Sequence, residues 1–140
     1  MKNNQKRKIA VDYIKNWIGH WYKWGGDDPS GFDCSGLVVE MLKSVGIVPR
    51  KFDATAAQLY KKFQYNVVSS PTKGCLAFWH NNNGKIIHVE ILVDEELTIG
   101  ASGGGSKTLT REDAIRDNAF IKMRPYRGRM NLHGFVDPFK

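Results

Sequence analysis

The 140-residue sequence lacks any apolar run long enough to cross a membrane. A membrane-spanning helix needs about 20 mainly apolar residues, and no stretch of this chain reaches that length. Residues 2–8 are basic, and an amphipathic segment follows them where a secretory signal would have its apolar core. We therefore predict a globular chain without a transmembrane segment or a signal peptide.

Cysteine is also scarce, with Cys34 and Cys75 as the whole complement. The two could pair in principle, but structural disulfides are rare in proteins made in a reducing cytosol. A zinc site usually shows close ligand spacing such as Cys-x-x-Cys, which is missing. The glycine-rich stretch 101–106 lacks the Gly-Lys-Ser/Thr ending of a phosphate loop. We predict no metal and no cofactor, and a buried structural role for Cys75, which opens an apolar stretch.

Acidic residues are outnumbered, since 14 Asp and Glu accompany 21 Lys and Arg and the net charge is +7. The basic residues concentrate at 2–8 and 122–129, and such an excess attracts polyanions. Nucleic acid is one such partner, but no recognised nucleic-acid-binding motif is present. A solvated basic face accounts equally well for each patch.

The segment Asp33-Cys34-Ser35-Gly36 opens a predicted amphipathic helix. Its buried stripe consists of Leu37, Val38, Met41, Leu42 and Val45, and Gly46 is a natural C-terminal stop. Asp33 is the expected N-cap, which places Cys34 in the first turn. Free backbone N–H groups and the helix dipole favour an anion there, so they favour the reactive thiolate. The same N–H groups can form an oxyanion hole. A buried, inert cysteine is the alternative, and the turn-rich loop before the helix argues against it.

A cysteine nucleophile needs a base, and His88 is the candidate. Residues 85–93 are mostly apolar and β-branched, which predicts a strand. Within that strand His88 and Glu90 share one face. The opposite face, expected to point toward the core, carries Ile87, Val89 and Ile91. A half-buried histidine without chemistry is the alternative, and the pattern around Cys34 makes the base the better interpretation.

Together these motifs resemble the NlpC-type family of cell-wall cysteine peptidases. The resemblance covers about residues 8–102 and rests on three segments: Tyr22-Lys-Trp-Gly-Gly…Gly31-Phe-Asp-Cys-Ser-Gly-Leu-Val38, Gly74-Cys-Leu-Ala-Phe-Trp79 and His88-Val-Glu-Ile91. Members of this family have a papain-like α+β core. They hydrolyse amide bonds in peptidoglycan stem peptides, commonly the γ-D-glutamyl–diamino-acid bond.

The resemblance implies a role for five residues. Cys34 is the implied nucleophile and His88 the implied base. The implied binding site for the free amino end of the stem peptide is formed by Tyr22, Asp33 and Ser35.

The chain departs from the family pattern at two places. Gly74-Cys75-Leu76 stands where Gly-Asp-Leu is usual. The family's third polar residue, often His, Asn or Gln, falls at Gly100, which has no side chain to orient an imidazole. A backbone carbonyl, a water, Glu90 or Ser102 is the candidate replacement, or the enzyme works as a dyad. Glu90 is the preferred side chain because it shares a face with His88, although a spacing of two residues is long for a direct bond.

We predict one α+β domain over residues 1–140, with a core at about 8–124 and a tail at 125–140 packed on it. Expected helices cover about 10–18, 34–45, 55–63 and 111–118, and expected strands cover about 74–79, 85–93, 96–100 and 119–124. Because the strands are close in sequence, we expect an antiparallel sheet of about five or six strands.

The function expected from the resemblance is hydrolysis of peptidoglycan stem peptides, with anionic wall polymers as further partners for the basic faces and no specific nucleic acid. Made in the cytoplasm, such an enzyme would act at the wall after lysis or as part of a virion, as a bacteriophage or bacterial endolysin does. Two alternatives remain open. One is a wall-binding or virion structural module that has lost its third active-site residue. The other is a papain-like amidase or acyltransferase with another substrate.

Overall fold

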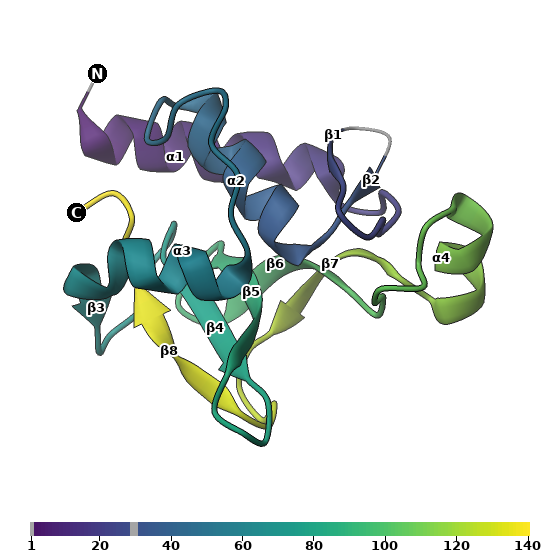
Figure 1. Cartoon of the computed structure of the whole chain (residues 1–140). Coiled ribbons are helices and arrows are strands. Elements are labelled where there is room, and N and C mark those ends of the chain that lie inside the picture. The colour runs from purple at the N-terminus through teal and green to yellow at the C-terminus, as the bar shows by residue number, and fades with distance from the viewer. Residues whose placement is uncertain (1, 29–30) are drawn as a thin grey trace.

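The computed structural model describes residues 2–28 and 31–140, and it has the predicted α+β architecture (Figure 1). Its helices are α1 (Asn3–Ile14), α2 (Cys34–Ser44), α3 (Ala56–Phe63) and α4 (Arg111–Asp117), with 3-10 turns at Lys15–Trp17 and Gln64–Asn66. A short ribbon is formed by β1 (Asp27–Asp28) and β2 (Gly31–Phe32). The main sheet is formed by β3 (Val67–Val68), β4 (Leu76–His80), β5 (Ile86–Leu92), β6 (Leu97–Ser102), β7 (Phe120–Pro125) and β8 (Leu132–Val136).

The main sheet is antiparallel throughout, in the order β3-β8-β4-β5-β6-β7. Strands β4, β5, β6 and β7 follow their order in the chain, as expected for short connections. Phe78 pairs with Val89 across β4 and β5, and Ile99 pairs with Met123 across β6 and β7. This register puts β5, which carries His88, near the middle of the sheet.

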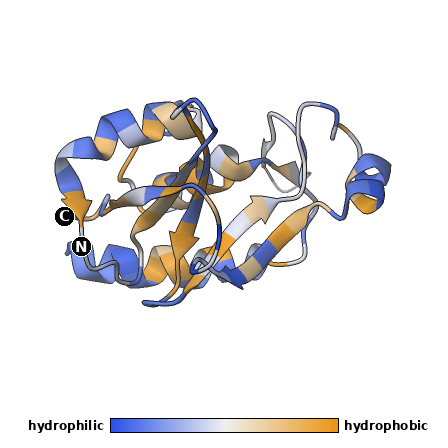
Figure 2. Cartoon of the chain, turned by 90° about the horizontal axis from the view of Figure 1, so that it is seen from below, coloured by the Kyte–Doolittle hydropathy of each residue, from blue (hydrophilic) through white to orange (hydrophobic). Residues whose placement is uncertain are grey.

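Helices α1, α2 and α3 cover one face of the sheet, and α4 stands at the end beyond β7 (Figure 1). Both α2 and α3 contact β5, and α1 packs on α2. Figure 2 shows the apolar residues on the strands and on the helix faces turned toward them. Among the described residues no helix combines the length and the apolar character that a membrane crossing requires.

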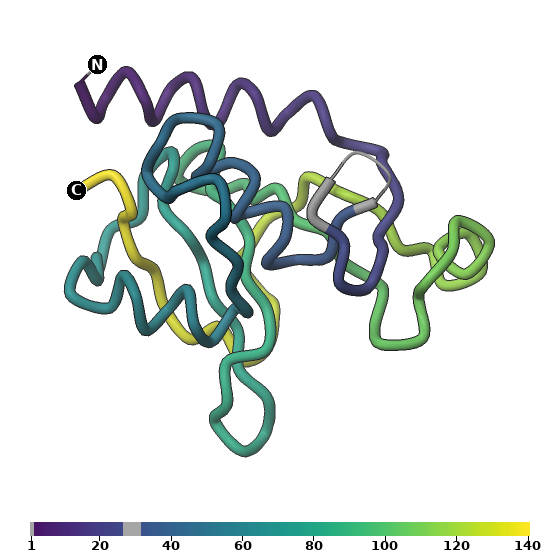
Figure 3. The backbone as a smooth tube through the Cα atoms, turned by 45° about the horizontal axis from the view of Figure 1, so that its top comes forward, coloured from purple at the N-terminus to yellow at the C-terminus, as the bar shows by residue number. Residues whose placement is uncertain are grey.

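Helix α1 begins well before the apolar stripe that predicted a helix from about residue 10. Its first two turns are polar, and they are held by contacts with the C-terminal segment. Asn3 Nδ2 donates to the Phe139 carbonyl at 2.8 Å, and Arg7 forms a 2.8 Å ion pair with Asp137. Figure 3 shows the two ends of the chain side by side. Long-range contacts of this kind leave no local sequence pattern.

The segment after residue 125 is more than a tail packed on the core, because residues 132–136 form strand β8. This strand lies between β3 and β4, with Val136 opposite both Val67 and Leu76. The C-terminal segment therefore supplies an inner strand of the sheet. Its Gly134 interrupts the β-branched pattern by which strands are recognised.

Strand β5 differs from the prediction at one position. Val89 and Ile91 are buried in the core as expected, but Ile87 is 53% exposed and lies at the rim of a cleft. Glu90, on the opposite face, is 1% exposed. Both faces of β5 are therefore covered near its centre, while Ile87 near its start is left uncovered.

Candidate functional site

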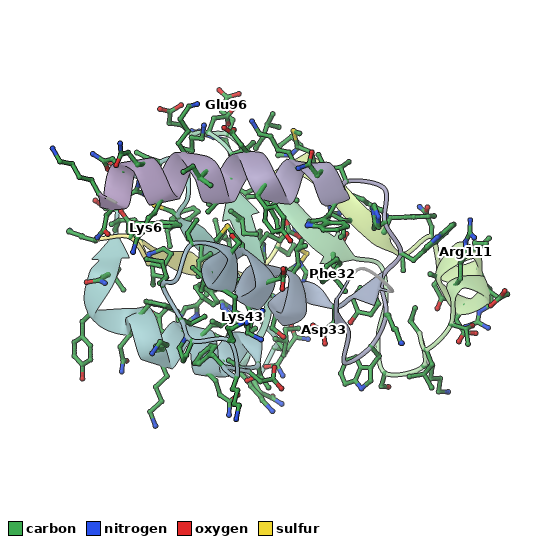
Figure 4. All side chains as sticks on the ribbon, turned by 90° about the horizontal axis from the view of Figure 1, so that it is seen from above. Lys6, Phe32, Asp33, Lys43, Glu96 and Arg111 are labelled. Carbon is green, nitrogen blue, oxygen red and sulfur yellow. The ribbon has the colours of Figure 1, made fainter. Side chains whose placement is uncertain are left out.

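Cys34 is the first residue of α2, where the Asp33 side chain caps the helix as predicted. Asp33 Oδ1 accepts the Gly36 N–H at 2.6 Å, and Oδ2 accepts the Gly25 N–H at 3.0 Å. The cap therefore ties the loop before the helix to its first turn. Figure 4 shows Phe32 and Asp33 at this end of α2, with Lys43 farther along the helix.

The first turn of α2 is in close contact with that loop. A Cβ atom on Gly36 would lie 2.0 Å from the carbonyl oxygen of Gly26, so only glycine fits there. The loop reaches the helix at van der Waals distance and fixes the position of the Cys34 backbone. Free backbone N–H groups at a helix N-terminus can stabilise an anion, as an oxyanion hole requires.

His88 lies on β5 and lines the same cleft as Cys34. Its Nε2 contacts Glu90 Oε2 at 2.6 Å, which leaves Nδ1 as the ring nitrogen for the thiol. Burial would lower the pKa of His88, but hydrogen bonds with Cys34 and Glu90, and their charges, outweigh burial and raise the pKa to about 9. The imidazole is therefore held as a cation, the form that stabilises a thiolate beside it.

Glu90 is a buried carboxylate inside a network of donors. Arg129 donates from Nη1 to Oε1 at 3.0 Å and from Nη2 to Oε2 at 2.7 Å. Thr98 Oγ1 donates to Oε1 at 2.6 Å, and Arg124 Nη2 approaches Oε2 at 3.3 Å. Burial would raise the pKa of Glu90, but the hydrogen bonds from His88 and Arg129 and their charges hold that pKa well below its ordinary value.

The direct contact between His88 and Glu90 corrects the expectation that a two-residue spacing is too long. Same-face neighbours on a strand are separated by about 6.5 Å, and the glutamate side chain spans that gap. Ser102, the other predicted orienter, is buried in the cleft, and its Oγ has no hydrogen-bond partner among the described residues. Of the two side chains, Glu90 is the one in contact with the ring.

The Glu90 side chain occupies the space beside Gly100. A Cβ atom on Gly100 would lie 2.2 Å from Glu90 Cγ and 2.5 Å from its Cδ. A side chain at position 100 and Glu90 in its present position therefore exclude each other. Gly100 has no side chain to orient the imidazole, and for the same reason it leaves room for the Glu90 carboxylate.

The cleft has a volume of about 970 Å³, and the three predicted substrate-binding residues Tyr22, Asp33 and Ser35 line it. Burial raises the pKa of Asp33, against the hydrogen bonds from the Gly36 and Gly25 N–H groups. Burial, followed by the charges of Cys34 and Asp33, also raises the pKa of the Tyr22 hydroxyl, which is therefore a neutral phenol. The cleft is acidic near Asp33 and Asp53, and Arg124 and Arg129 also line it.

Sequence reasoning missed Arg129, Thr98 and Trp79 as parts of the site. The guanidinium carbon of Arg129 lies 4.1 Å from the centre of the Trp79 ring, and that ring lies 5.4 Å from the His88 ring. Arg129 sits in the segment between β7 and β8, where its charge was interpreted as part of a basic patch. The one signal in the sequence was a glutamate at position 90 within an apolar strand, because a carboxylate that is buried there needs a cationic partner.

Cys75 does not line the cleft and is 1% exposed in a small buried cluster with Ala77 and Leu92. Its Sγ lies 3.9 Å from Thr72 Oγ1, and both cysteines are free thiols. This agrees with the predicted buried structural role. In the part of the chain that the structure describes, no group of three or more His, Cys, Asp or Glu side chains is arranged to hold a metal ion.

Comparison with known proteins matches residues 19–124 to the NlpC/P60 family model. The chain belongs to the NlpC/P60 family. The matched range extends beyond the predicted 8–102 at its C-terminal end and begins later at its N-terminal end. It stops before Arg129, so the NlpC/P60 match does not include the segment that holds Glu90 in place.

Three relatives illustrate the likeness to other NlpC/P60 proteins. The murein DD-endopeptidase MepH of Escherichia coli (strain K12) is 38% identical over 60 residues, which are 42% of this chain and 21% of MepH. The probable endopeptidase p60 of Listeria seeligeri is 35% identical over 91 residues, 64% of this chain and 16% of that protein. This chain therefore spans about a fifth or less of their length. An NlpC/P60 family protein from Bacillus cereus ATCC 10987 has a TM-score of 0.75 at 20% identity, covering 96% of this chain and 40% of that structure, which shows a shared fold.

Proposed function

We propose that this chain is a cysteine peptidase that hydrolyses an amide bond in peptidoglycan stem peptides. The observation that carries the proposal is the convergence of Cys34, at a helix N-terminus, and His88 in one cleft, with Glu90 on the far nitrogen of the imidazole. A nucleophile, a base and an orienting group in this order form the general pattern of nucleophilic acyl transfer. The name of the relative MepH, a murein DD-endopeptidase, supports the substrate class.

In the proposed mechanism Cys34 attacks the carbonyl carbon of the scissile amide as a thiolate. The backbone N–H of Cys34 at the start of α2 stabilises the oxyanion of the tetrahedral intermediate. His88 gives its proton to the leaving amine, and an acyl-enzyme remains on Cys34. A water then loses a proton to His88 and attacks the thioester, which releases the acid and restores the thiolate.

The substrate's free amino end is proposed to bind between Tyr22, Asp33 and Ser35. Asp33 supplies negative charge, and the neutral Tyr22 hydroxyl supplies a hydrogen-bonding group. A cationic ammonium at this end would place the second amide of the stem peptide near Cys34. The γ-D-glutamyl–diamino-acid bond is the proposed target, because it follows the second residue counted from that amino end.

A module that has lost its activity is the alternative from another class, and its support was the glycine at position 100. Glu90 occupies that space and contacts His88, so we favour an active enzyme. Amidase or acyltransferase activity on another substrate would use the same three residues. It would differ in the test that follows, because the wild type would then leave peptidoglycan undigested.

The test is mass spectrometry of purified peptidoglycan incubated with the wild type and with Cys34→Ala. We expect new stem-peptide fragments with the wild type and a loss of at least about 10³-fold in the variant, since removal of a nucleophile eliminates the covalent route. Cys75→Ala is the matched control and should retain activity. Equal digestion by folded Cys34→Ala would overturn the mechanism, and no digestion of several wall types would overturn the substrate.

A further inference from the structure

The carboxylate behind His88 is held by a residue from outside the family-matched range. Arg129 makes two hydrogen bonds to Glu90, one to each oxygen, at 3.0 and 2.7 Å. This fork-to-fork geometry fixes the plane of a carboxylate as well as its charge. Arg124 makes one longer contact, at 3.3 Å, and its side chain is 40% exposed against 21% for Arg129. Arg129 is therefore the principal partner.

Arg129 is itself fixed on its other side. Its guanidinium carbon lies 4.1 Å from the centre of the Trp79 ring, and the same ring lies 5.4 Å from that of His88. Cation–π contacts of this kind favour Arg over Lys, because the planar group stacks on the ring. Trp79 thus contacts both the base and the arginine that positions the carboxylate.

The third relevant feature is the space beside Gly100. The resemblance places the family's orienting side chain at this position, and here its Cβ atom would overlap Glu90 Cγ. The two arrangements are mutually exclusive. A carboxylate on β5 can occupy this space only if β6 has a glycine there, and a buried carboxylate needs a cation to compensate its charge.

We propose that Arg129 is a positioning residue of the catalytic site, and that Glu90, Gly100 and Arg129 together replace the orienting side chain that the family carries on β6. This inference rests on the proposed function, because it assigns a role behind His88. Arg129 keeps the Glu90 carboxylate ionised and in the plane of the imidazole, and it stabilises the imidazolium through Glu90.

The first test compares Arg129→Met, Arg129→Lys and the control Arg127→Met, a charge removal in the same connection whose side chain stacks on Tyr126 instead. The readout is the rate of Cys34 alkylation by iodoacetamide against pH, measured by mass spectrometry, together with kcat and KM for wall fragments. Alkylation needs no wall substrate, so failure of the proposed substrate and failure of this inference give different results.

We expect Arg129→Met to move the rise of the alkylation rate to higher pH by about one unit, which corresponds to a tenfold change in the ion-pair equilibrium. The groups that face Glu90 are His88, Thr98, Arg124 and Arg129, and loss of the Arg129 cation frees the carboxylate to turn toward Arg124 and away from the ring. A carboxylate that no longer contacts the ring stabilises the imidazolium less, so we expect Cys34 to react at higher pH. We expect kcat to fall roughly 10- to 100-fold, as when an outer-shell partner is removed.

The lysine variant separates charge from geometry. Arg129→Lys keeps the cation but loses the fork, so we expect an unchanged alkylation profile with a reduced kcat. It also carries the test if Arg129→Met does not fold. A wild-type profile and kcat in both folded Arg129 variants would overturn the inference. An increase in KM alone, without a shift in the profile, would do the same, because it would make Arg129 a substrate contact.

The second test exchanges the two arrangements. Gly100→Asn should inactivate the enzyme because its side chain collides with Glu90, and Glu90→Ala should lose the orienting group. The double variant Glu90→Ala/Gly100→Asn restores a side chain to β6 in a space now empty. We expect the alkylation rate of Cys34 in the double variant to rise at lower pH than in either single variant. Its kcat should exceed that of both single variants by at least about tenfold. A double variant no better than the worse single would refute the exchange.

Discussion

At the scale of single residues, the site depends on His88 and Glu90, and the local sequence pattern indicates only part of their arrangement. His88 and Glu90 were recognisable as polar residues on one face of an apolar strand. Their 2.6 Å contact was not predictable, because it depends on the side-chain conformation that Arg129 and Thr98 impose on Glu90. Ile87 was misplaced for a related reason: alternation gives the face of a residue but not where the covering layer ends.

His88 provides the prediction at this scale. Its pKa is raised to about 9 in the folded protein, from about 6.5 in the unfolded chain. The raised value stabilises the fold fully below pH 6.5, and that contribution of about 3 kcal/mol is lost as the pH rises to 9. Urea unfolding from pH 6 to 10 should therefore show a decline in the wild type that His88→Ala lacks.

The same titration affects catalysis. Loss of the His88 proton removes the cation that stabilises the thiolate, so kcat/KM should decline on the alkaline side with an apparent pKa near 9. An equal decline in stability for the wild type and His88→Ala would contradict the assignment of the raised pKa to this residue.

At the scale of elements, α2 and the β4–β5 and β5–β6 hairpins were predictable because their signals are local. The N-cap at Asp33, the stop at Gly46 and the turn residues between the strands all lie within a few residues of what they control. The first turns of α1 and strand β8 were not predictable. Each is stabilised by partners more than 50 residues away in sequence, such as Asp137 for Arg7 and Leu76 for Val136.

Gly36 gives the prediction at the scale of the helix. Helix propensity alone favours Gly36→Ala by about 1 kcal/mol. The new Cβ atom, however, would lie 2.0 Å from the Gly26 carbonyl oxygen, so the loop or the helix must move. We expect overpacking to prevail, with a net loss of about 1–3 kcal/mol. Displacement of Cys34 should lower kcat/KM at least about tenfold.

Gly105→Ala is the control for this substitution. No atom lies within 4 Å of the position its Cβ would take, and it lies in the loop after β6. Thermal unfolding and peptidoglycan digestion of both variants make the comparison. A Gly36→Ala protein with wild-type stability and rate would show that the loop is not the support of the nucleophile.

At the scale of the whole molecule, the polar contact between the two ends of the chain closes the fold. Arg7 donates to Asp137 at 2.8 Å and to the Lys73 carbonyl at 2.9 Å, so it joins α1, the turn before β4 and the C-terminal segment. Because β8 is an inner strand next to β4, the position of the C-terminal segment affects β4 and, through it, β5 with His88. A contact far from the cleft thus helps to keep the site residues in place.

Arg7→Met should lower the free energy of unfolding by about 2 kcal/mol, because hydrogen bonds to charged groups contribute more than neutral ones. Lys8→Met is its neighbour on α1 and loses only an exposed ion pair with Asp12, at 3.6 Å. That change should stay within about 0.5 kcal/mol. Chemical denaturation of the two variants beside the wild type measures the difference, and equal effects would show that the ends are not tied in solution.

Adjacent ends have a topological consequence. Asn3 lies within hydrogen-bonding distance of Phe139, at 2.8 Å, so a few residues of linker could join the two ends of this domain into a ring. New termini could then be opened at the exposed turn of residues 82–84, giving a circular permutant with an unbroken sheet. By the same geometry the whole domain can be inserted into a surface loop of a host protein, since both of its connections leave from one point.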